Sequence, residues 1–173
     1  MAVADETSAG SEPVDADAAR EAEWAAGASF LEGLVGALGE QAEVEVVALG
    51  DDEAEVRVNG GDLGVLIGPR GQTLIALQDL TRLAAQRRVG DRHGRMRIDI
   101  GGYRERRREA LARFTEQVAS EVIASGASRA LEPMSSMDRK VVHDAANELE
   151  GVETVSEGEE PFRRVVIRPA ARA

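Results

Sequence analysis

Cysteine is missing from this sequence and aromatic residues are scarce, and each shortage excludes a class of protein. None of the 173 residues is cysteine, which excludes disulfide bonds and thiolate metal sites and favours a reducing compartment. Phe, Trp and Tyr together make up only 3% of the chain. A hydrophobic core must therefore be built from Leu, Val, Ile and Ala, and an apolar content of 43% is enough to build one.

Long apolar runs and enzymatic signatures are missing too. No apolar stretch reaches the ~18 residues that a membrane-spanning helix needs, and the acidic N-terminus lacks the basic-then-apolar pattern of a secretion signal. The histidines do not form a metal-binding pair, and neither a P-loop lysine nor a nucleophile-elbow serine is present. We therefore expect a cytoplasmic protein that is not an enzyme, has no integral membrane span and uses no cofactor or metal.

The net charge of −11 conceals an uneven distribution along the chain. Residues 1–60 contain 15 acidic and 2 basic residues, whereas residues 62–131 contain 8 acidic and 13 basic residues. A basic segment behind an acidic front can mark an anion-binding face. The alternative is a compositional bias, because Lys140 is the only lysine and charged runs of this kind are often solvated surface.

The first part of the chain predicts an acidic tail followed by a small α+β domain. We assign residues 1–19 to an acidic disordered tail. Its residues 1–16 are small, polar and acidic and cannot bury enough apolar area to become ordered. Residues 20–101 predict the order helix, strand, strand, helix, helix, strand. The expected elements are a helix at 17–38, strands at 42–49 and 53–60, helices at 63–67 and 72–88, and a strand at 95–101. The helix at 72–88 is expected to bury Leu74, Ile75, Leu77, Leu80, Leu83 and Ala84.

The second part of the chain predicts a long helix and a second small domain. Residues 102–125 are highly charged in their first half, so we expect a helix that links the two domains through solvent. Residues 126–170 predict a helix packed on a short antiparallel sheet. The expected elements are a strand at 128–134, a helix that begins after the N-cap Ser135 and ends near Glu150, and a hairpin of residues 152–158 and 163–169. The predicted fold class is therefore α+β with two small domains.

The loop Gly68-Pro69-Arg70-Gly71 separates two apolar helical patterns. Two glycines and a proline stop a helix, and the helix that follows then presents its first N–H groups and the positive end of its dipole. Glycines let a phosphodiester approach the backbone closely, and Arg70 adds a positive charge. We interpret the loop as a clamp for the phosphates of a single strand. The alternative is that Gly68 and Gly71 only close a tight helix–helix turn.

Arg139 and His143 form a second candidate site. They are four residues apart on the helix predicted after Ser135, so they share one face of it. Two donors aimed in the same direction suit a phosphate or a base edge. The alternative is surface decoration, because charged pairs with this spacing are common on exposed helices.

Both candidate sites lie in segments that resemble known nucleic-acid-binding domains. Residues 20–101 resemble a type II KH domain, which holds about four nucleotides at an I-G-x-x-G loop between its second and third helices. This loop and its flanks read "VLIGPRGQTLIALQ" here. The segment "LEPMSSMDRKVVHDAANELEGVETVSEGEEPFRRVVI" resembles the R-3-H domain, named for an Arg-x-x-x-His motif that matches Arg139 and His143. In this order, over about residues 20–170, the two segments resemble the Jag, or KhpB, family.

The resemblance implies a function and a set of partners. The expected ligand is single-stranded RNA, with single-stranded DNA open for the second domain, and the expected role is a post-transcriptional regulator or RNA chaperone linked to cell-wall elongation and cell shape. A small KhpA-like KH protein, or self-association, is the expected protein partner. Longer members carry a further N-terminal Jag domain, and we expect the acidic tail in its place. The alternative is a scaffold that dimerises through its KH fold and binds little RNA.

Other basic residues are weaker candidates. Arg87, Arg88 and Arg95 surround the strand predicted at 95–101 and would extend a phosphate track, although a solvated face explains them equally well. The helix predicted at 103–125 begins with four arginines, Arg104, Arg106, Arg107 and Arg108. They either connect the RNA-binding sites of the two domains or pair with Glu105 and Glu109 along the helix. His93 lies in a polar turn and is expected to be solvated. Few aromatic rings argue against the RRM and OB-fold, which stack bases on aromatic side chains.

Overall fold

The computed structural model describes residues 16–90 and 94–170, and the chain divides into two compact units between Gly101 and Gly102. Most of the predicted disordered tail, and His93, lie outside the described residues. The last four residues assigned to that tail are not a tail, because the first helix begins at Ala16. No helix among the described residues is long and apolar enough to cross a membrane.

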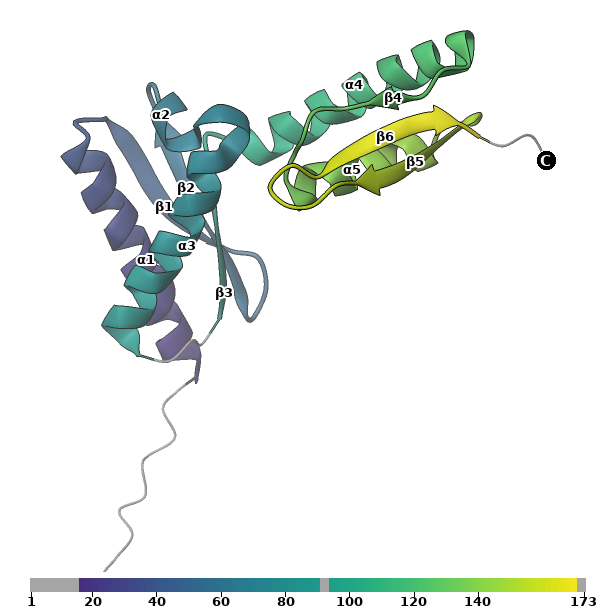
Figure 1. Ribbon diagram of the computed structural model, residues 1–173. Coiled ribbons are helices and arrows are strands. Elements are labelled where there is room, and N and C mark those ends of the chain that lie inside the picture. The colour runs from purple at the N-terminus through teal and green to yellow at the C-terminus, as the bar shows by residue number, and fades with distance from the viewer. Residues whose placement is uncertain (1–15, 91–93, 171–173) are drawn as a thin grey trace, which may run out of the picture. The chain divides into compact units, whose positions relative to one another are not determined.

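Unit 1, which ends at Gly101, is a three-stranded sheet with two helices on one face (Figure 1). Strands β1 (Ala42–Ala48) and β2 (Glu53–Gly60) pair antiparallel, and β2 pairs parallel with β3 (Arg95–Ile100). The helices on the sheet are α1 (Ala16–Ala37) and α3 (Gln72–Val89), and the short α2 (Gly64–Ile67) precedes α3. The predicted order helix, strand, strand, helix, helix, strand is confirmed.

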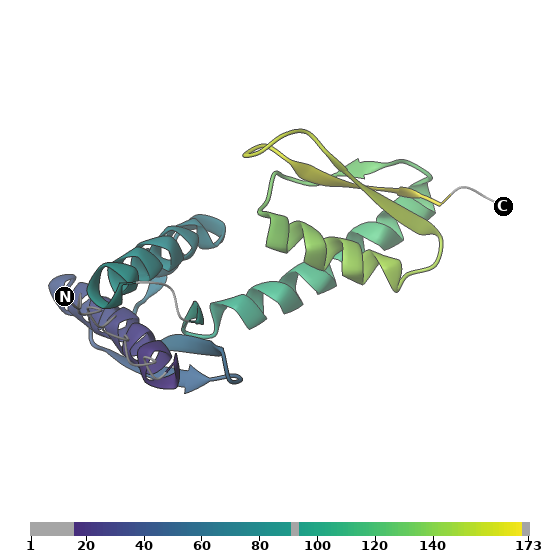
Figure 2. The same cartoon turned by 90° about the horizontal axis from the view of Figure 1, so that it is seen from below.

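The core of unit 1 lies between this sheet and its two helices (Figure 2). Alternate residues of β2 are buried, which is the pattern of a strand with one covered face. The largest contributions to the core are aliphatic, as the scarcity of aromatic residues predicts. They come from Leu31, Val56, Val58, Leu74, Ile98 and Ile100, all of which are at most 2% exposed.

The buried face of α3 differs from the predicted one. Leu74 and Leu77 are buried as expected, but Ile75, Leu80 and Leu83 are between 43% and 52% exposed. Small residues, Thr81 and Ala85, take the inward positions of the later turns instead. α1 approaches α3 closely at Thr81, since a Cβ on Gly27 would lie 3.3 Å from Cγ2 of Thr81. The larger side chains are therefore turned to the opposite face of α3.

A side chain of α3 also fastens the edge strand of the sheet. The Gln78 amide nitrogen donates to the Met96 carbonyl over 2.9 Å, and its amide oxygen accepts from the Ile98 N–H over 2.8 Å. These backbone groups lie on β3, which has no strand beyond it in the sheet order β1-β2-β3. Gln78 therefore takes the place of part of a neighbouring strand.

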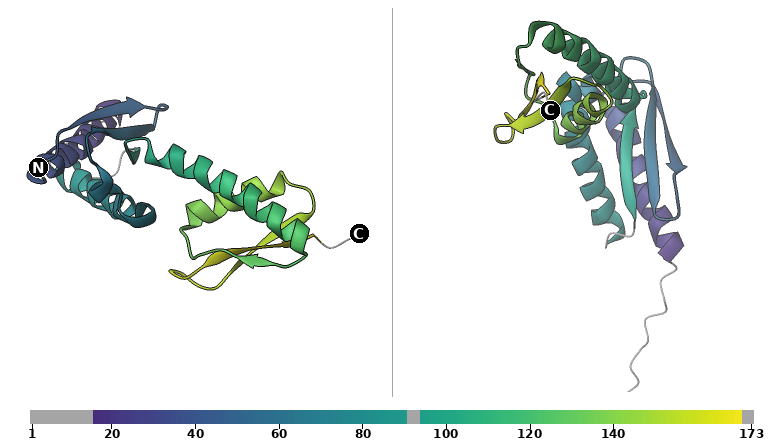
Figure 3. Two further views of the ribbon diagram at one scale, coloured as in Figure 1. Left: turned by 90° about the horizontal axis from the view of Figure 1, so that it is seen from above. Right: turned by 90° about the vertical axis from the view of Figure 1, so that its right-hand side faces the viewer.

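Unit 2 is an antiparallel sheet with two helices (Figure 3). The helices are α4 (Tyr103–Ser125) and α5 (Ser136–Asn147). The strands β4 (Arg129–Ala130), β5 (Val152–Glu157) and β6 (Arg164–Pro169) are arranged in the order β4-β6-β5. Both helices and the sheet share one aliphatic core, which includes Val118, Val122, Val142, Val165 and Ile167.

The start of α5 and the role of α4 can both be compared with the sequence-based predictions. Ser135 caps α5 as predicted, since its hydroxyl accepts from the Asp138 N–H over 3.2 Å. We expected the helix over 103–125 to be a separate linker, but Leu111, Val118 and Val122 lie in the core of unit 2. The charged first half that suggested a linker is the first part of an element that belongs to this second unit.

Replacing Gln78 by Met is expected to lower the free energy of unfolding of unit 1 by about 1–3 kcal/mol, because the Ile98 N–H and the Met96 carbonyl lose their partner. Urea denaturation monitored by Trp24 fluorescence measures this, since Trp24 is the only tryptophan and is buried in unit 1. Gln86→Met is the matched control on the same helix, because the Gln86 side chain has no hydrogen bond to another described residue. Equal unfolding midpoints for the two variants contradict the prediction.

Candidate nucleic-acid interface

The loop between α2 and α3 has a backbone that ordinary residues avoid. Gly68, Arg70 and Gly71 have φ angles of 68°, 54° and 77°, and Pro69 begins a short 3-10 turn between them. Left-handed φ values carry no steric penalty for glycine, but Arg70 is the only non-glycine residue among those described that has one. The sequence predicted a break at these glycines, and the structure shows its geometry.

Gly68 has a second, steric requirement. A Cβ at this position would lie 2.0 Å from Oγ1 of Thr73 and 3.1 Å from its backbone nitrogen. The open face of Gly68 therefore lies directly against the first turn of α3. Any side chain here would displace Thr73 and cover that turn.

The loop leaves the N-terminal end of α3 without a capping side chain. Its N-cap residue is Gly71, and no side chain there accepts a hydrogen bond from the helix. The Gly68 and Gly71 N–H groups are already bonded, to the carbonyls of Gly64 (2.9 Å) and Gly68 (3.2 Å), and Pro69 has no N–H. The Gln72 N–H is bonded as well, to the Pro69 carbonyl. An anion would therefore meet the N–H groups of α3 from Thr73 onward, the positive end of its dipole and the exposed Arg70.

The three arginines predicted as a phosphate track are not next to this loop. Arg87 and Arg88 are exposed in the last turn of α3, and an 18-residue helix is roughly 27 Å long. Arg95 begins β3 and forms an ion pair with Asp52 (3.2 Å). Arg87 and Arg88 lie where positive charge stabilises the C-terminal end of a helix dipole.

The face of the sheet that the helices do not cover is charged but internally compensated. Glu55 accepts from Arg57 over 2.8 Å and from Arg97 over 3.1 Å, and the paired strands bring these side chains together. The hydrogen bond from Arg57 to Glu55 raises the pKa of the Arg57 guanidinium. Because the arginines are already paired with carboxylates, this face is a poor site for a phosphate chain.

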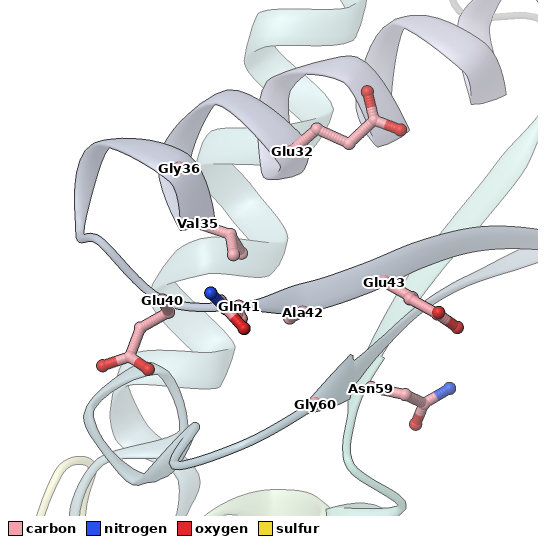
Figure 4. Close-up of a pocket in the computed structure, with 9 residues that line it drawn as sticks. All are labelled: Glu32, Val35, Gly36, Glu40, Gln41, Ala42, Glu43, Asn59 and Gly60. Carbon is pink, nitrogen blue, oxygen red and sulfur yellow. The ribbon is translucent and has the colours of Figure 1, made fainter.

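A surface hollow of about 670 Å³ lies between the end of α1 and the start of β1 (Figure 4). Glu32, Glu40 and Glu43 line it, and their carboxylates point away from one another. Its negative charge disfavours a nucleic acid. The described residues also contain no group of His, Asp or Glu side chains placed to hold a metal ion.

In unit 2, Arg139 lies inside the protein rather than on its surface. It is only 7% exposed, and its guanidinium is held on both sides. One nitrogen donates to the Met134 carbonyl over 2.8 Å, and the other forms an ion pair of 2.6 Å with Glu160 on the loop between β5 and β6. Direct contact between Arg139 and a phosphate thus requires Glu160 to move.

His143 faces β5. Its Nδ1 lies 2.6 Å from the Thr154 hydroxyl and its Nε2 lies 2.8 Å from the Ser156 hydroxyl. Arg139 and His143 share a helix face, as their spacing predicts, but they contact different segments. The sequence analysis missed Thr154, Ser156 and Glu160. For Thr154 and Ser156, the sequence offers one indication: the Thr-x-Ser alternation of a strand places both hydroxyls on one face. Nothing in the sequence indicates Glu160.

The arginines of α4 are mostly paired. Arg107 forms an ion pair with Asp138 (3.0 Å), Arg108 with Glu105 (2.5 Å) and Arg113 with Glu109 (3.8 Å). The hydrogen bonds from Arg108 lower the pKa of the Glu105 carboxyl. Of the four arginines between residues 104 and 108, Arg108 pairs with one of the predicted glutamates and Arg107 pairs instead with Asp138 of α5.

Comparison with protein families matches each unit to a known domain. Residues 28–100 match the KH domain of KhpA and KhpB, and residues 109–169 match the R-3-H domain. The first match covers most of unit 1 with its glycine loop. The second covers most of α4 and the rest of unit 2 up to Pro169, including Arg139 and His143.

Several curated proteins are similar in sequence to most of this chain. RNA-binding protein KhpB of Clostridium symbiosum is 39% identical over 140 residues, which is 80% of this chain and 62% of the relative. RNA-binding protein KhpB of Lactiplantibacillus plantarum is 38% identical over 138 residues, 80% of this chain and 42% of the relative. The protein of the same name from Bacillus subtilis is 38% identical over 64% of this chain and 53% of its own length. The chain thus spans between about two-fifths and three-fifths of these relatives, and it contains a KhpA/KhpB-type KH domain followed by an R-3-H domain.

Proposed function

We propose that this protein binds single-stranded RNA, with Gly68, Pro69, Arg70 and Gly71 as a phosphate clamp in unit 1. The observation that carries the proposal is the left-handed loop that leaves the first turn of α3 uncapped beside an exposed arginine. Such a turn accepts an anion close to the backbone, and it does not discriminate between bases. The names of the KhpB relatives support RNA as the ligand.

Unit 2 binds a second stretch of the same strand or a single-stranded DNA. Arg139 and His143 organise this site by fixing the loop after β5 and the hydroxyls of β5. Two weak sites on one chain raise the overall affinity because the second contact is intramolecular. We infer that the activity is binding and not catalysis, as the names of the KhpB relatives support.

The biological role follows from the family resemblance. We infer a cytoplasmic post-transcriptional regulator or RNA chaperone linked to cell-wall elongation and cell shape. Binding without base-specific contacts in the clamp suits a protein that acts on many transcripts.

A protein partner is favoured by the apolar side chains on the outer face of α3. Ile75, Leu80 and Leu83 are about half exposed, although the pattern of the helix predicted them to be buried. We propose that this face binds a KhpA-like KH protein or a second copy of the chain. The same face supports the alternative function, a scaffold that dimerises through its KH unit and binds little RNA.

Replacing Arg70 by Asp is expected to weaken binding of a short single-stranded RNA roughly ten-fold or more, because a charged contact to phosphate becomes a repulsion. Fluorescence anisotropy at several salt concentrations measures this. A clamp with about three to five phosphate contacts gives a log–log salt slope of about −2 to −3.5, and the variant should have a flatter one. Arg113→Asp, a charge reversal at an exposed site on α4, is the control. Equal losses in both variants would show a general charge effect and no clamp.

Replacing both Leu80 and Leu83 by Asp is expected to abolish association through α3 and leave RNA affinity nearly unchanged. Sedimentation velocity, with the chain alone and with a small KH protein added, measures the association. Ile123→Asp, at a 53% exposed position of α4, is the matched apolar control. Association that survives the double substitution excludes this face as the interface, and association without any RNA binding by the wild type supports the scaffold.

A further inference from the structure

The loop between β5 and β6 presents the most exposed large apolar side chain among the described residues. Phe162 is 74% exposed, in a chain that has only three phenylalanines. Trp24, by contrast, is 7% exposed. Exposing a ring to water is unfavourable, and an aromatic side chain left in this position is suited to stacking on another flat, apolar surface.

The backbone around Phe162 is fixed by hydrogen bonds to its own loop and to the segment before α5. The Phe162 N–H donates to the Glu159 carbonyl over 2.8 Å, and the Arg163 carbonyl accepts from the Met134 N–H over 3.1 Å. Arg139 joins the same two segments, because it binds the Met134 carbonyl and the Glu160 carboxylate. The buried arginine of the family motif thus holds the loop that displays the ring.

Two arginines beside Phe162 are available to an anionic ligand, on a loop that also carries Glu159, and Glu157 lies opposite Arg164 in the strand pairing. Arg163 and Arg164 follow it directly, are exposed, and form no ion pair with an acid among the described residues. The negative charge of Glu160 is matched by Arg139. Phe114 offers a contrast: it is 45% exposed, but the neighbouring Arg113 is paired with Glu109.

We propose that Phe162 is a base-stacking residue of unit 2, that Arg163 and Arg164 contact the adjoining phosphates, and that Arg139 positions the loop without touching the nucleic acid. The ligand is a single-stranded stretch, because only an unpaired base offers its flat face to a ring. This inference rests on the proposed RNA-binding function and assigns that function a second site.

Phe162→Ala in the full chain should weaken binding of a single-stranded RNA roughly five-fold or more, whereas Phe114→Ala should have little effect. The salt slope should stay as in the wild type, since no phosphate contact is lost. Phe162→Trp should retain affinity, and its fluorescence should be quenched by RNA beyond any change in the buried Trp24 of the wild type. An oligonucleotide of abasic residues, with the same phosphates, should not quench it.

The positioning role of Arg139 is tested through its partner, because loss of a buried arginine could unfold unit 2. Glu160→Ala removes a negative charge, so electrostatics alone predicts tighter RNA binding. A positioning role predicts weaker binding and reduced quenching in the Glu160→Ala/Phe162→Trp variant. Glu159→Ala is the matched control, since this neighbouring side chain holds no described residue, and it should bind RNA slightly more tightly.

The outcomes separate this inference from the proposed function. If the wild type binds RNA, Arg70→Asp weakens it, and Phe162→Ala binds like Phe114→Ala, the clamp stands and the stacking site is wrong. If Phe162→Trp is quenched equally by abasic and ordinary strands, the ring does not stack on bases. If the wild type binds no single strand at any salt concentration, the proposed function fails as well.

Discussion

The conformation of one four-residue loop is the constraint on which the proposed binding site of unit 1 depends. Left-handed backbone at Gly68, Arg70 and Gly71 turns the chain sharply enough for α3 to begin without a capping side chain. Glycine adopts this conformation freely, but Arg70 does so at a cost of roughly 1–2 kcal/mol. Asparagine or glycine would be more stable there, so the positive charge is retained at the expense of folding stability.

The candidate site of unit 2 depends in the same way on Arg139, but this residue acts from inside the protein. The glycine loop exposes groups to a ligand, whereas Arg139 is buried and donates its hydrogen bonds to other groups of the protein. A guanidinium suits this task, because its fixed fork can bind a carbonyl and a carboxylate simultaneously. The two short motifs of this chain therefore differ in kind. Pro69 and Arg70 of the Gly68–Gly71 loop are exposed, whereas Arg139 is buried and holds an exposed loop in place.

Local patterns were sufficient to predict most of the fold. The hairpins, the break at Gly68 and the cap at Ser135 each depend on neighbouring residues, and all of them are present. The exposed face of α3 could not be predicted, because Thr81 and Ala85 are buried by the close approach of α1, which is distant in sequence. The role of the helix after Gly102 was misjudged for a similar reason, since charge in its first half concealed the apolar half that packs on the second sheet.

The candidate sites also differ in whether they depend on neighbouring residues or on residues distant in the sequence. Sequence located the glycine loop, since its geometry is encoded in four adjacent residues. It located Arg139 but not its surroundings, because Glu160 lies 21 residues away and meets it only in the folded unit. Arg95 was assigned to a phosphate track without knowledge of Asp52, which is 43 residues distant and pairs with it.

The hydrogen bonds of Gln78 also determine how unit 1 behaves in a concentrated solution. A sheet with two open edges is a template for indefinite growth by strand addition. In this sheet β3 is partly closed by the Gln78 amide. The other edge, β1, carries Glu43 and Glu45, so two such edges repel each other. Both edges of the sheet are thus protected against pairing with the strands of another copy.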